Sequence, residues 1–500
     1  MLSSRLLRRA PLLAVFAVAL VGGCGSSDDE KTPAPEPQAE SPRFITDAKG
    51  RVLILRGINT SNSTKADPDR SPRLTDADID RIAHRWGFNF VRYLILWDAL
   101  EPSPGQIDAA YLERIAADVK RLGEAGVYVM LDMHQDVYAA KYCCDGAPAW
   151  AIRDDGLPFE QQELWALNYM EPAVQRAFDN FWDAGGPHAD LQQRFAATWQ
   201  AVAARFAGEP SVIGYDLFNE PFPGSDFDGA EALFRKTPED GGTSKTFDET
   251  KLGPFYQRVI DAIRKVDSDH WIFFESRYGA PANGSPSYIP KLTDRRPGGP
   301  RLVFAPHLYS AGAEATGRFS AGDPTVSLWE TQRAADLARH GGPLLLGEWF
   351  SFTWADPNSR PFVDQILTMA DRLQIGWAYW AYDPGSPTGS ALRAEDGTDN
   401  PATAVIVRPY PRAIAGVPVS FGFDASARAL ELTFEPRAGV TGPTELAVPA
   451  HTYPEGFDVE VPTDPGRQVS FDAATGVVRV TTDPNISPQR IRVVPKPKGP

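Results

Sequence analysis

The stretch Gly214-Tyr-Asp-Leu-Phe-Asn-Glu-Pro221 places a carboxylate, Glu220, at the end of a short apolar run. The stretch Pro343-Leu-Leu-Leu-Gly-Glu-Trp349 repeats the pattern with Glu348. Each run is typical of a buried parallel strand, where a carboxylate at the strand end is unfavourable unless it has a role. Because the two runs are far apart in the sequence, they indicate one site at the carboxyl ends of a barrel's strands.

Short apolar segments alternate with helical segments from residue 44 to residue 400. Eight such strands with intervening helices predict an α/β fold, the (β/α)8 or TIM barrel. Long insertions at 143–187 and 221–250 are expected on the face that carries the two glutamates. The expected strands are Val52–Ile58, Phe88–Leu94, Val127–Asp132, Val212–Leu217, Trp271–Phe274, Leu302–Ala305, Leu344–Gly347 and Ile375–Tyr379. Helices are expected at Asp76–Trp86, Ala109–Ala125, Leu191–Phe206 and Phe255–Val266.

The residue pattern changes beyond residue 404: helical periodicity ends, and short β-type runs separated by turn residues follow. This pattern predicts a β-sandwich over 404–500. Its expected strands are Val417–Phe423, Ala429–Phe434, Gly456–Val461, Val469–Asp472, Val477–Thr481 and Ile491–Val494.

Residues 1–24 have the features of an export signal: an arginine-rich start and an apolar core, Ala10–Val21, that is too short to span a bilayer. The sequence Val21-Gly-Gly-Cys24 resembles a bacterial lipobox, which predicts lipidation of Cys24; the alternative is an ordinary cleavable signal with a chance cysteine. The polar, proline-rich residues 25–43 are expected to form a disordered tether. We therefore expect an exported protein, either secreted or attached to the membrane surface by an N-terminal lipid anchor.

The remaining two cysteines, Cys143 and Cys144, are adjacent in the sequence. In an oxidising compartment they form a disulfide or stay as two thiols, and the sequence leaves both open. A metal site is not expected, because no Cys-x-x-Cys motif or matching histidine cluster is nearby.

Composition excludes some partners. With 42% hydrophobic residues, 500 residues are ample for a large core. The net charge of −15 argues against nucleic acid, which requires a basic face. We expect a monomer that needs no cofactor.

Paired carboxyl groups indicate glycoside hydrolysis, in which one protonates the leaving oxygen and the other attacks the anomeric carbon. Glu220 is the expected acid and then base, with a pKa raised by burial and by the second carboxylate. Glu348 is the expected nucleophile. Arg92, at a strand end, and Tyr309 are the expected hydrogen-bond donors to it.

Other polar side chains are expected around this pair. Asn219 precedes the acid and is expected to bind the sugar 2-hydroxyl. His134 and His307 end apolar strands; they contact substrate or orient the acid, or else they are satisfied core residues. Lys65 and Asp136, on loops, are candidates for sugar hydroxyls. Trp380, after the last strand, is the candidate floor for the sugar ring.

In this order the residues resemble those of family 5 glycoside hydrolases, a retaining, barrel-type family. The positions that carry the resemblance are Arg92, His134, Asn219, Glu220, His307, Tyr309, Glu348 and Trp380. Within the family the chain is most similar to the endoglycoceramidases, through Leu55-Arg-Gly-Ile-Asn-Thr-Ser-Asn62 with Lys65, Asp132-Met-His-Gln-Asp136, Phe218-Asn-Glu-Pro221 and Val407-Arg-Pro-Tyr-Pro411. The resemblance implies cleavage between an oligosaccharide and ceramide in a glycosphingolipid. It also implies that Lys65, Asp136 and Asn219 bind the sugar next to the scissile bond.

Several alternatives stay open. Aromatic residues after the two glutamates either form an apolar groove for ceramide or only pack the loops; they are Phe218, Phe222, Phe227, Trp349, Phe350, Phe352 and Trp354. A β-glucosidase for another glucolipid such as a steryl glucoside, or a β-1,4-endoglucanase, has the same barrel. A carbohydrate-binding lipoprotein without activity is disfavoured because both carboxylates are present.

Overall fold

The computed structural model describes residues 42–60, 62–227, 243–350, 354–383 and 390–497. The export signal with Cys24, most of the predicted tether and Phe352 lie outside the described residues. Within the described ranges, no helix combines the length and the apolar character needed to cross a bilayer.

Eight parallel strands form the first sheet, in the order β7-β6-β5-β4-β3-β2-β9-β8. A parallel bridge between Phe304 and Leu344 joins the two outer strands and closes the barrel. Every strand of this sheet is buried almost throughout, as parallel strands covered by helices must be. The predicted TIM barrel is therefore confirmed. Its strands are β2 (Arg56–Asn59), β3 (Phe90–Leu96), β4 (Tyr128–His134), β5 (Val212–Asp216), β6 (Trp271–Phe274), β7 (Leu302–Phe304), β8 (Leu345–Leu346) and β9 (Gly376–Tyr379).

The expected first strand, Val52–Ile58, is wrong as a single element. It divides into β1 (Val52–Leu53), which pairs with β10 (Tyr410–Ile414) of the C-terminal region, and β2 of the barrel. Val52 packs in the C-terminal core and Leu53 packs in the barrel core. One apolar run thus serves two cores, and its hydrophobicity alone does not reveal the division.

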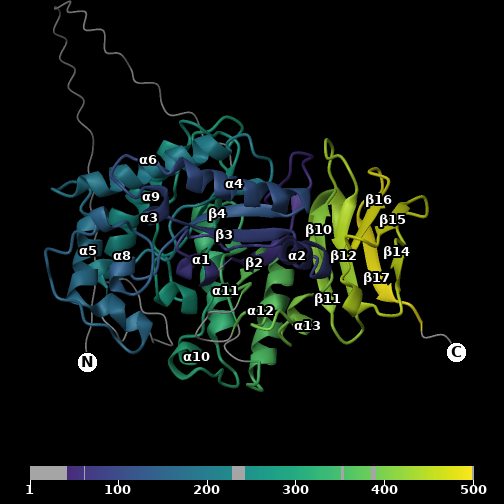
Figure 1. The fold of residues 1–500 in the computed structure, drawn as a ribbon. Coiled ribbons are helices and arrows are strands. Elements are labelled where there is room, and N and C mark those ends of the chain that lie inside the picture. Colours follow the sequence, from purple (N-terminus) through teal and green to yellow (C-terminus); the bar gives the residue numbers. More distant parts are fainter. Residues whose placement is uncertain (1–41, 61, 228–242, 351–353, 384–389, 498–500) are drawn as a thin grey trace, which may run out of the picture. The chain divides into compact units, whose positions relative to one another are not determined.

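Helices surround the barrel (Figure 1). Helix α4 begins at a capping residue: Asp108 accepts a hydrogen bond of 2.9 Å from the backbone N–H of Tyr111. The expected helix Asp76–Trp86 is α-helical only to Asp80 and continues as a π-helical turn, Arg81–Arg85. The helices are α1 (Asn62–Ala66), α2 (Asp76–Asp80), α3 (Trp97–Leu100), α4 (Ala109–Glu124), α5 (Pro172–Trp182), α6 (Ala189–Phe206), α8 (Thr243–Phe247), α9 (Gly253–Ile263), α10 (Ala311–Thr316), α11 (Thr325–His340), α12 (Ser359–Leu373) and α13 (Thr403–Ile406).

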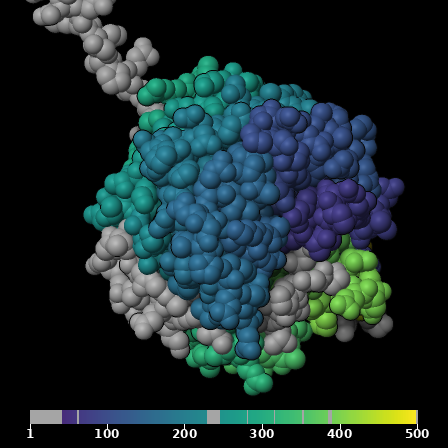
Figure 2. All heavy atoms as spheres, turned by 60° about the vertical axis from the view of Figure 1, so that its left-hand side comes forward, coloured from purple at the N-terminus to yellow at the C-terminus, as the bar shows by residue number. Residues whose placement is uncertain are grey.

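The insertion after β4 is an ordered part of the domain. Phe178, Phe181 and Trp182 of α5 are buried and pack edge-on against Phe222, Phe255 and Phe218, respectively. The blue atoms in the space-filling view belong to the part of the chain that contains this insertion, and they cover the centre of one face (Figure 2).

The C-terminal region consists of two antiparallel sheets around one core, which confirms the predicted sandwich. In Figure 1 its strands run from green to yellow. One sheet has the order β1-β10-β13-β16-β15, and the other has the order β11-β12-β17-β14. The strands not yet given are β11 (Gly416–Asp424), β12 (Ala429–Pro436), β13 (Thr444–Ala447), β14 (Phe457–Glu460), β15 (Gln468–Asp472), β16 (Val477–Thr481) and β17 (Gln489–Pro495).

A buried ionic cluster joins the sandwich to the barrel. Asp371 of α12 accepts from Arg56 of β2 and, at 2.8 Å, from Arg408, which precedes β10. The guanidinium of Arg56 also lies over the ring of Tyr410. The hydroxyl of Tyr410 donates a hydrogen bond to the carbonyl of Gly87, just before β3. The sandwich therefore contacts the amino ends of barrel strands, and the carboxyl ends are left for the site.

Candidate active site

All ten substrate-site residues predicted from the sequence lie in one connected set of contacts at the carboxyl ends of the barrel strands. They come from α1 (Lys65), β3 (Arg92), β4 and the loop after it (His134, Asp136), and the segments that follow β5 (Asn219, Glu220), β7 (His307, Tyr309), β8 (Glu348) and β9 (Trp380). Lys65, Asp136, Glu220, Tyr309 and Trp380 are partly exposed, and the other five are buried. The partly exposed side chains line the open side of the set, and the buried ones, Glu348 among them, form its floor.

The carboxylate of Glu348 is held at both oxygens. Nη1 of Arg92 donates to Oε1 at 2.5 Å, and the hydroxyl of Tyr309 donates to Oε2 at 2.6 Å. Burial and the nearby charge of Glu348 raise the pKa of Tyr309 well above its ordinary value, so the phenol keeps its proton and remains a donor. Both donors expected from the sequence are therefore in contact with Glu348.

Glu220 lies opposite this carboxylate. A carboxylate oxygen of Glu220 and one of Glu348 lie within 4.8 Å of each other. Nδ1 of His307 lies 2.8 Å from Oε1 of Glu220. Burial raises the pKa of Glu220, His307 opposes the rise, and Glu348 adds to it; the net direction is upward. A carboxyl group that keeps its proton to a higher pH than usual is suited to act as a general acid.

Asn219 is fixed by the residues around it. Its Oδ1 accepts a hydrogen bond of 3.0 Å from Arg92, and its Nδ2 donates to the carbonyl of Gln135, also at 3.0 Å. The amide is 1% exposed. Arg92 thus orients both the nucleophile candidate and the residue next to the acid candidate.

A second group of contacts lies beside this pair. Lys65 forms an ion pair with Asp136, and its ammonium lies 4.5 Å from the ring centroid of Trp380. The ring of His134 stacks on Trp380, with centroids 5.5 Å apart. Burial and Lys65 lower the pKa of His134, but Asp132 and Asp136 outweigh them and raise it to about 9. Burial raises the pKa of Asp136, but the charge of Lys65 prevails and lowers it. A cation, an anion and an aromatic face in contact are suited to bind a sugar ring and its hydroxyls.

Two family models match the chain: cellulase (glycosyl hydrolase family 5) over residues 46–386, and the glycoside hydrolase family 5 C-terminal domain over residues 408–494. The chain belongs to glycosyl hydrolase family 5. Among its relatives, endoglycoceramidase I of Rhodococcus hoagii (strain 103S) is 32% identical over 464 residues, which cover 90% of this chain and 87% of the relative.

Solved structures of endoglycoceramidase II from Rhodococcus sp. are also similar to this family 5 enzyme. The ganglioside GM3 complex is 36% identical, with a TM-score of 0.83 over 91% of this chain and 100% of the other. The lactosyl-enzyme intermediate is 37% identical, with a TM-score of 0.80 over the same shares of the two chains.

The sequence analysis missed several polar residues of this site. Asp132, Asp216 and Glu275 are buried and surround Arg92, with contacts of 2.8 to 2.9 Å. Gln135 donates from Nε2 to the carbonyls of Asn219 and Glu220 at 3.0 and 3.1 Å. The signal that identified Glu220 and Glu348 was also present at Glu275, which directly follows the apolar strand Trp271–Phe274.

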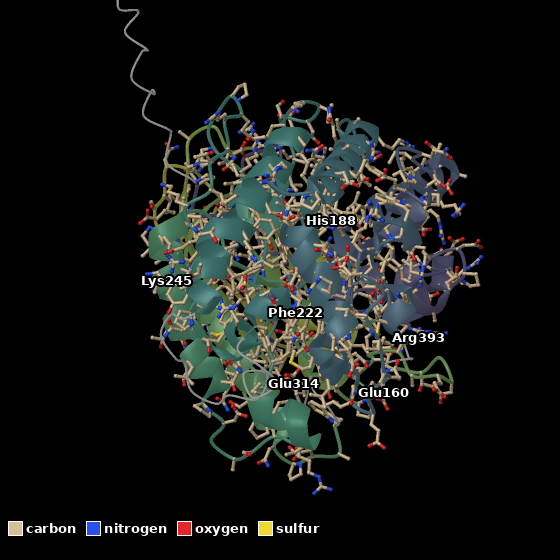
Figure 3. The ribbon with its side chains drawn as sticks, turned by 90° about the vertical axis from the view of Figure 1, so that its left-hand side faces the viewer. Glu160, His188, Phe222, Lys245, Glu314 and Arg393 are labelled. Atoms are coloured by element: carbon tan, nitrogen blue, oxygen red, sulfur yellow. A yellow bond between two sulfur atoms is a disulfide. The ribbon has the colours of Figure 1, made fainter. Side chains whose placement is uncertain are left out.

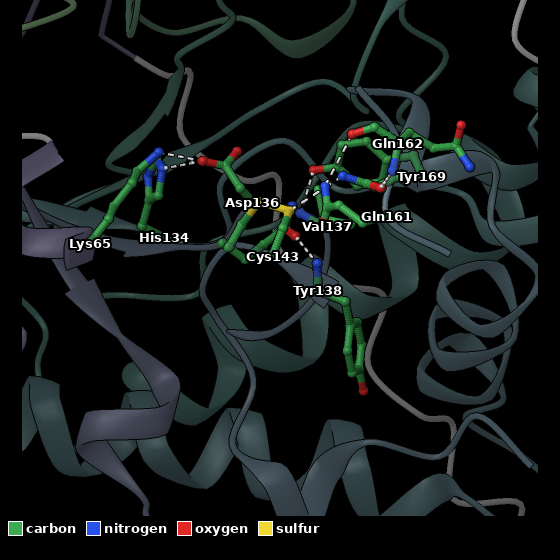
Figure 4. Close-up of a disulfide and its surroundings, with 12 residues drawn as sticks. Lys65, His134, Asp136, Val137, Tyr138, Cys143, Gln161, Gln162 and Tyr169 are labelled. Atoms are coloured by element: carbon green, nitrogen blue, oxygen red, sulfur yellow. Dashed lines mark hydrogen bonds and ion pairs between the residues drawn. A yellow bond between two sulfur atoms is a disulfide. The ribbon is translucent and has the colours of Figure 1, made fainter. Parts of the chain in front are cut away.

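Cys143 and Cys144 form a disulfide, so the question left open by the sequence is answered. Asn168 donates to Sγ of Cys143 at 3.5 Å on one side. On the other side, Asp145 and Asp136 exchange two backbone hydrogen bonds of 3.2 and 3.3 Å. Figure 4 shows the disulfide next to Asp136 and its contacts to Lys65 and His134. The disulfide therefore anchors the loop that carries a residue of the candidate sugar site.

The aromatic residues after the two glutamates mostly pack inward. Phe218, Phe222, Trp349 and Phe350 are less than 9% exposed. Phe222 stacks on Tyr169 and lies at the centre of Figure 3, among other side chains. For these four residues the loop-packing interpretation holds. Among the described members of the set, Phe227 and Trp354 are half-buried and are still able to face a lipid.

Apart from the group that contains Glu220 and Glu348, the described part of the chain has two groups of acidic or histidine side chains that are close enough together to hold a metal ion. The group His134, Asp136 and Asp145 is next to the ammonium of Lys65. The group Asp132, Asp216 and Glu275 surrounds Arg92. One cation of the enzyme lies in each group, Lys65 in the first and Arg92 in the second. That no metal is required stays a prediction.

Proposed function

We propose that this family 5 enzyme is a retaining, endo-acting glycosidase that hydrolyses the β-glycosidic bond between an oligosaccharide and ceramide in glycosphingolipids. The observation that supports it most directly is the separation of the two carboxylates. Retaining enzymes have carboxyl groups about 5 Å apart, whereas inverting enzymes need about 6.5–9.5 Å to admit a water molecule. An oxygen of Glu220 and an oxygen of Glu348 lie within 4.8 Å of each other, which agrees with the separation in retaining enzymes.

In the first step, an oxygen of Glu348 attacks the anomeric carbon and the bond from that carbon to the ceramide oxygen breaks. Glu220 gives its proton to the departing oxygen, so ceramide leaves as a neutral alcohol. Arg92 and Tyr309 hold the attacking carboxylate in one orientation. The product on the enzyme is a glycosyl ester of Glu348.

In the second step, Glu220 is a carboxylate and removes a proton from a water molecule. The water oxygen bonds to the anomeric carbon, and the ester bond to Glu348 breaks. The sugar leaves with the configuration it had in the substrate, and Glu220 regains its proton. His307, in contact with Glu220 at 2.8 Å, orients that carboxyl group in both steps.

Ceramide is supported as the leaving group by the relatives. An endoglycoceramidase is 32% identical over nearly the whole chain, and the solved relative with a TM-score of 0.83 is a ganglioside GM3 complex. Lys65, Asp136 and Trp380 form the polar and aromatic set proposed to bind the sugar next to the scissile bond.

The decisive experiment is incubation with lactosylceramide and analysis of both products. Free lactose with ceramide supports the proposal. Release of galactose or glucose alone contradicts it and favours a glucosidase. Glucosylceramide, a steryl glucoside and carboxymethyl cellulose are the comparison substrates; a rate on any of them well above that on lactosylceramide also contradicts the proposal.

We further propose that the enzyme is an exported lipoprotein, held at a membrane surface through Cys24, and that it is monomeric. The support is the arginine-rich, apolar start and the Val21-Gly-Gly-Cys24 sequence. Cys24→Ser should abolish incorporation of a labelled fatty acid and move the enzyme from the membrane fraction to the soluble fraction. Unchanged labelling in the variant would refute the anchor. Light scattering of the solubilised enzyme tests the monomer.

A further inference from the structure

Glu275 is buried at the carboxyl end of β6. It lies between Arg92, which binds Glu348, and the pair formed by Glu220 and His307. Its Oε1 accepts a hydrogen bond of 2.8 Å from Nη2 of Arg92. Its Oε2 accepts from the backbone N–H of Glu220 at 3.2 Å and lies 3.1 Å from Nε2 of His307. The hydroxyl of Tyr256 donates to its carbonyl at 3.0 Å, which fixes the backbone at this point.

We propose that Glu275 is a positioning residue for the hydrolysis, and that it joins both catalytic glutamates: Glu220 through its backbone N–H and through His307, and Glu348 through Arg92. It is 1% exposed and does not touch the substrate itself. The inference concerns the hydrolytic pair and rests on the roles assigned to it in the proposed function, but it does not depend on the identity of the lipid.

The backbone of Glu220 has φ of 40°. This left-handed conformation is unfavourable for a residue with a side chain and persists only where neighbouring groups enforce it. Here Glu275 accepts from the N–H, and Gln135 donates from Nε2 to the carbonyl at 3.1 Å. Two buried side chains therefore hold the peptide groups on both sides of the acid in place.

The ring of His307 is surrounded by carboxylates. The titratable groups that face its ring are Glu220 (2.8 Å from Nδ1), Glu348 (3.5 Å from Nδ1) and Glu275 (3.1 Å from Nε2), and the ring of Tyr309 meets it edge-on. Burial alone lowers the pKa of His307, but the charges of Glu275 and Glu348 outweigh it and raise the pKa well above the ordinary value. The surrounding carboxylates therefore favour the imidazolium form of His307, whose Nδ1 is in contact with Glu220.

Glu275 also shares the guanidinium of Arg92 with the nucleophile Glu348. Nη2 binds Glu275 while Nη1 binds Glu348, so Glu275 restricts rotation of the group that orients the nucleophile. Asp216 also binds Arg92, through Nε at 2.8 Å. No contact of Asp216 with His307 or Glu220 is present among the described residues, which makes it the matched control.

The test compares Glu275→Gln, which keeps the shape and removes the charge, with Asp216→Asn. The titration of His307 is followed by NMR of ¹⁵N-histidine-labelled enzyme, with His307→Gln used to assign its signal. We expect Glu275→Gln to lower the pKa of His307 by about one unit or more, because the largest favourable charge is lost. Asp216→Asn should leave it within about 0.3 units.

Turnover of an aryl β-lactoside gives a second readout. Glu275→Gln should reduce kcat by about 10²-fold with little change in KM, since its contacts orient groups that act in the transition state. An unchanged pKa of His307, or kcat within about twofold of the wild type, would overturn the proposal. Neither measurement uses ceramide. A failure of the proposal for Glu275 can therefore be distinguished from a failure of the substrate assignment.

Glu275→Asp covers the case in which the glutamine variant does not fold. The shorter side chain keeps a negative charge beside Arg92 but withdraws from the N–H of Glu220. We expect a reduced kcat with His307 still protonated. A kcat equal to that of the wild type in this variant contradicts the positioning role.

Discussion

Nη1 of Arg92 lies 2.5 Å from Oε1 of Glu348, and both side chains are buried. The contact crosses the barrel from β3 to the end of β8, and Tyr309 completes it at the other oxygen. A carboxylate fixed at both oxygens has one orientation toward an anomeric carbon. Reactions that depend on that orientation should therefore respond to changes at either donor.

Glu348→Gln should abolish turnover, with a loss of at least about 10⁴-fold in kcat for every substrate, because nothing replaces a nucleophile. Glu220→Gln should lose about 10²–10⁴-fold on lactosylceramide but much less on an aryl lactoside in the first step, since a good leaving group needs no proton. Rates on both substrates test this. Glu330→Gln, at a partly exposed ion pair, is the control for the fold. Equal losses on both substrates in the Glu220 variant would refute the division of roles.

The released sugar should have the same anomeric configuration as the substrate, because the carboxylates have the retaining separation. Proton NMR during the first minutes of hydrolysis, before mutarotation, measures it. Initial appearance of the α-anomer from a β-glycoside would exclude the mechanism.

Tyr309→Phe removes one of the two donors to Glu348. A hydrogen bond to a charged group is worth about 1.5–3 kcal/mol, so kcat should decrease by about 10–150-fold. KM should change little, because the contact is to the enzyme's own carboxylate. Substitution of Tyr288, a tyrosine outside the set, to Phe provides the comparison. A loss confined to KM would show that Tyr309 binds substrate instead.

The pH dependence should follow Glu220. The first step requires its protonated form, so kcat/KM falls as pH rises through its pKa. Since that pKa is raised, activity should persist above the pH at which an ordinary glutamate, with a pKa of about 4.3, loses its proton. For an aryl glycoside with a good leaving group the decline on the alkaline side should be weaker. A single pH profile shared by both substrates would contradict this assignment.

Asp371→Ala should destabilise the barrel and the sandwich together. The change leaves Arg56 and Arg408 buried without their carboxylate, which costs about 3–5 kcal/mol. Calorimetry should show one transition at a lower temperature. Glu431→Gln, at the exposed pair with Arg492, should cost no more than about 1 kcal/mol. Two separate transitions in the wild type would mean that the two parts unfold independently.

The sequence predicted the site better than it predicted the strand boundaries. Glu220 and Glu348 were identifiable because each follows a short, mostly apolar strand and lies in a recognisable motif, Asn-Glu-Pro or Gly-Glu-Trp. Glu275 follows an equally apolar strand but has no motif around it, and its importance comes from partners on three other strands. The exchange of backbone bonds between Asp136 and Asp145 depends on a loop geometry that no spacing rule predicts.

The pairing of Val52 with Ile414 has a consequence for the order of events during synthesis. The segment that carries β1 is among the first described parts of the chain to be made, and its partner strand follows only after the whole barrel sequence. Strand β1 therefore has no partner to pair with until the barrel sequence and β10 have been made. A chain truncated after the barrel lacks that partner, and a chain still being translated lacks it as well. The synthesis of β10 thus determines when β1 can become native.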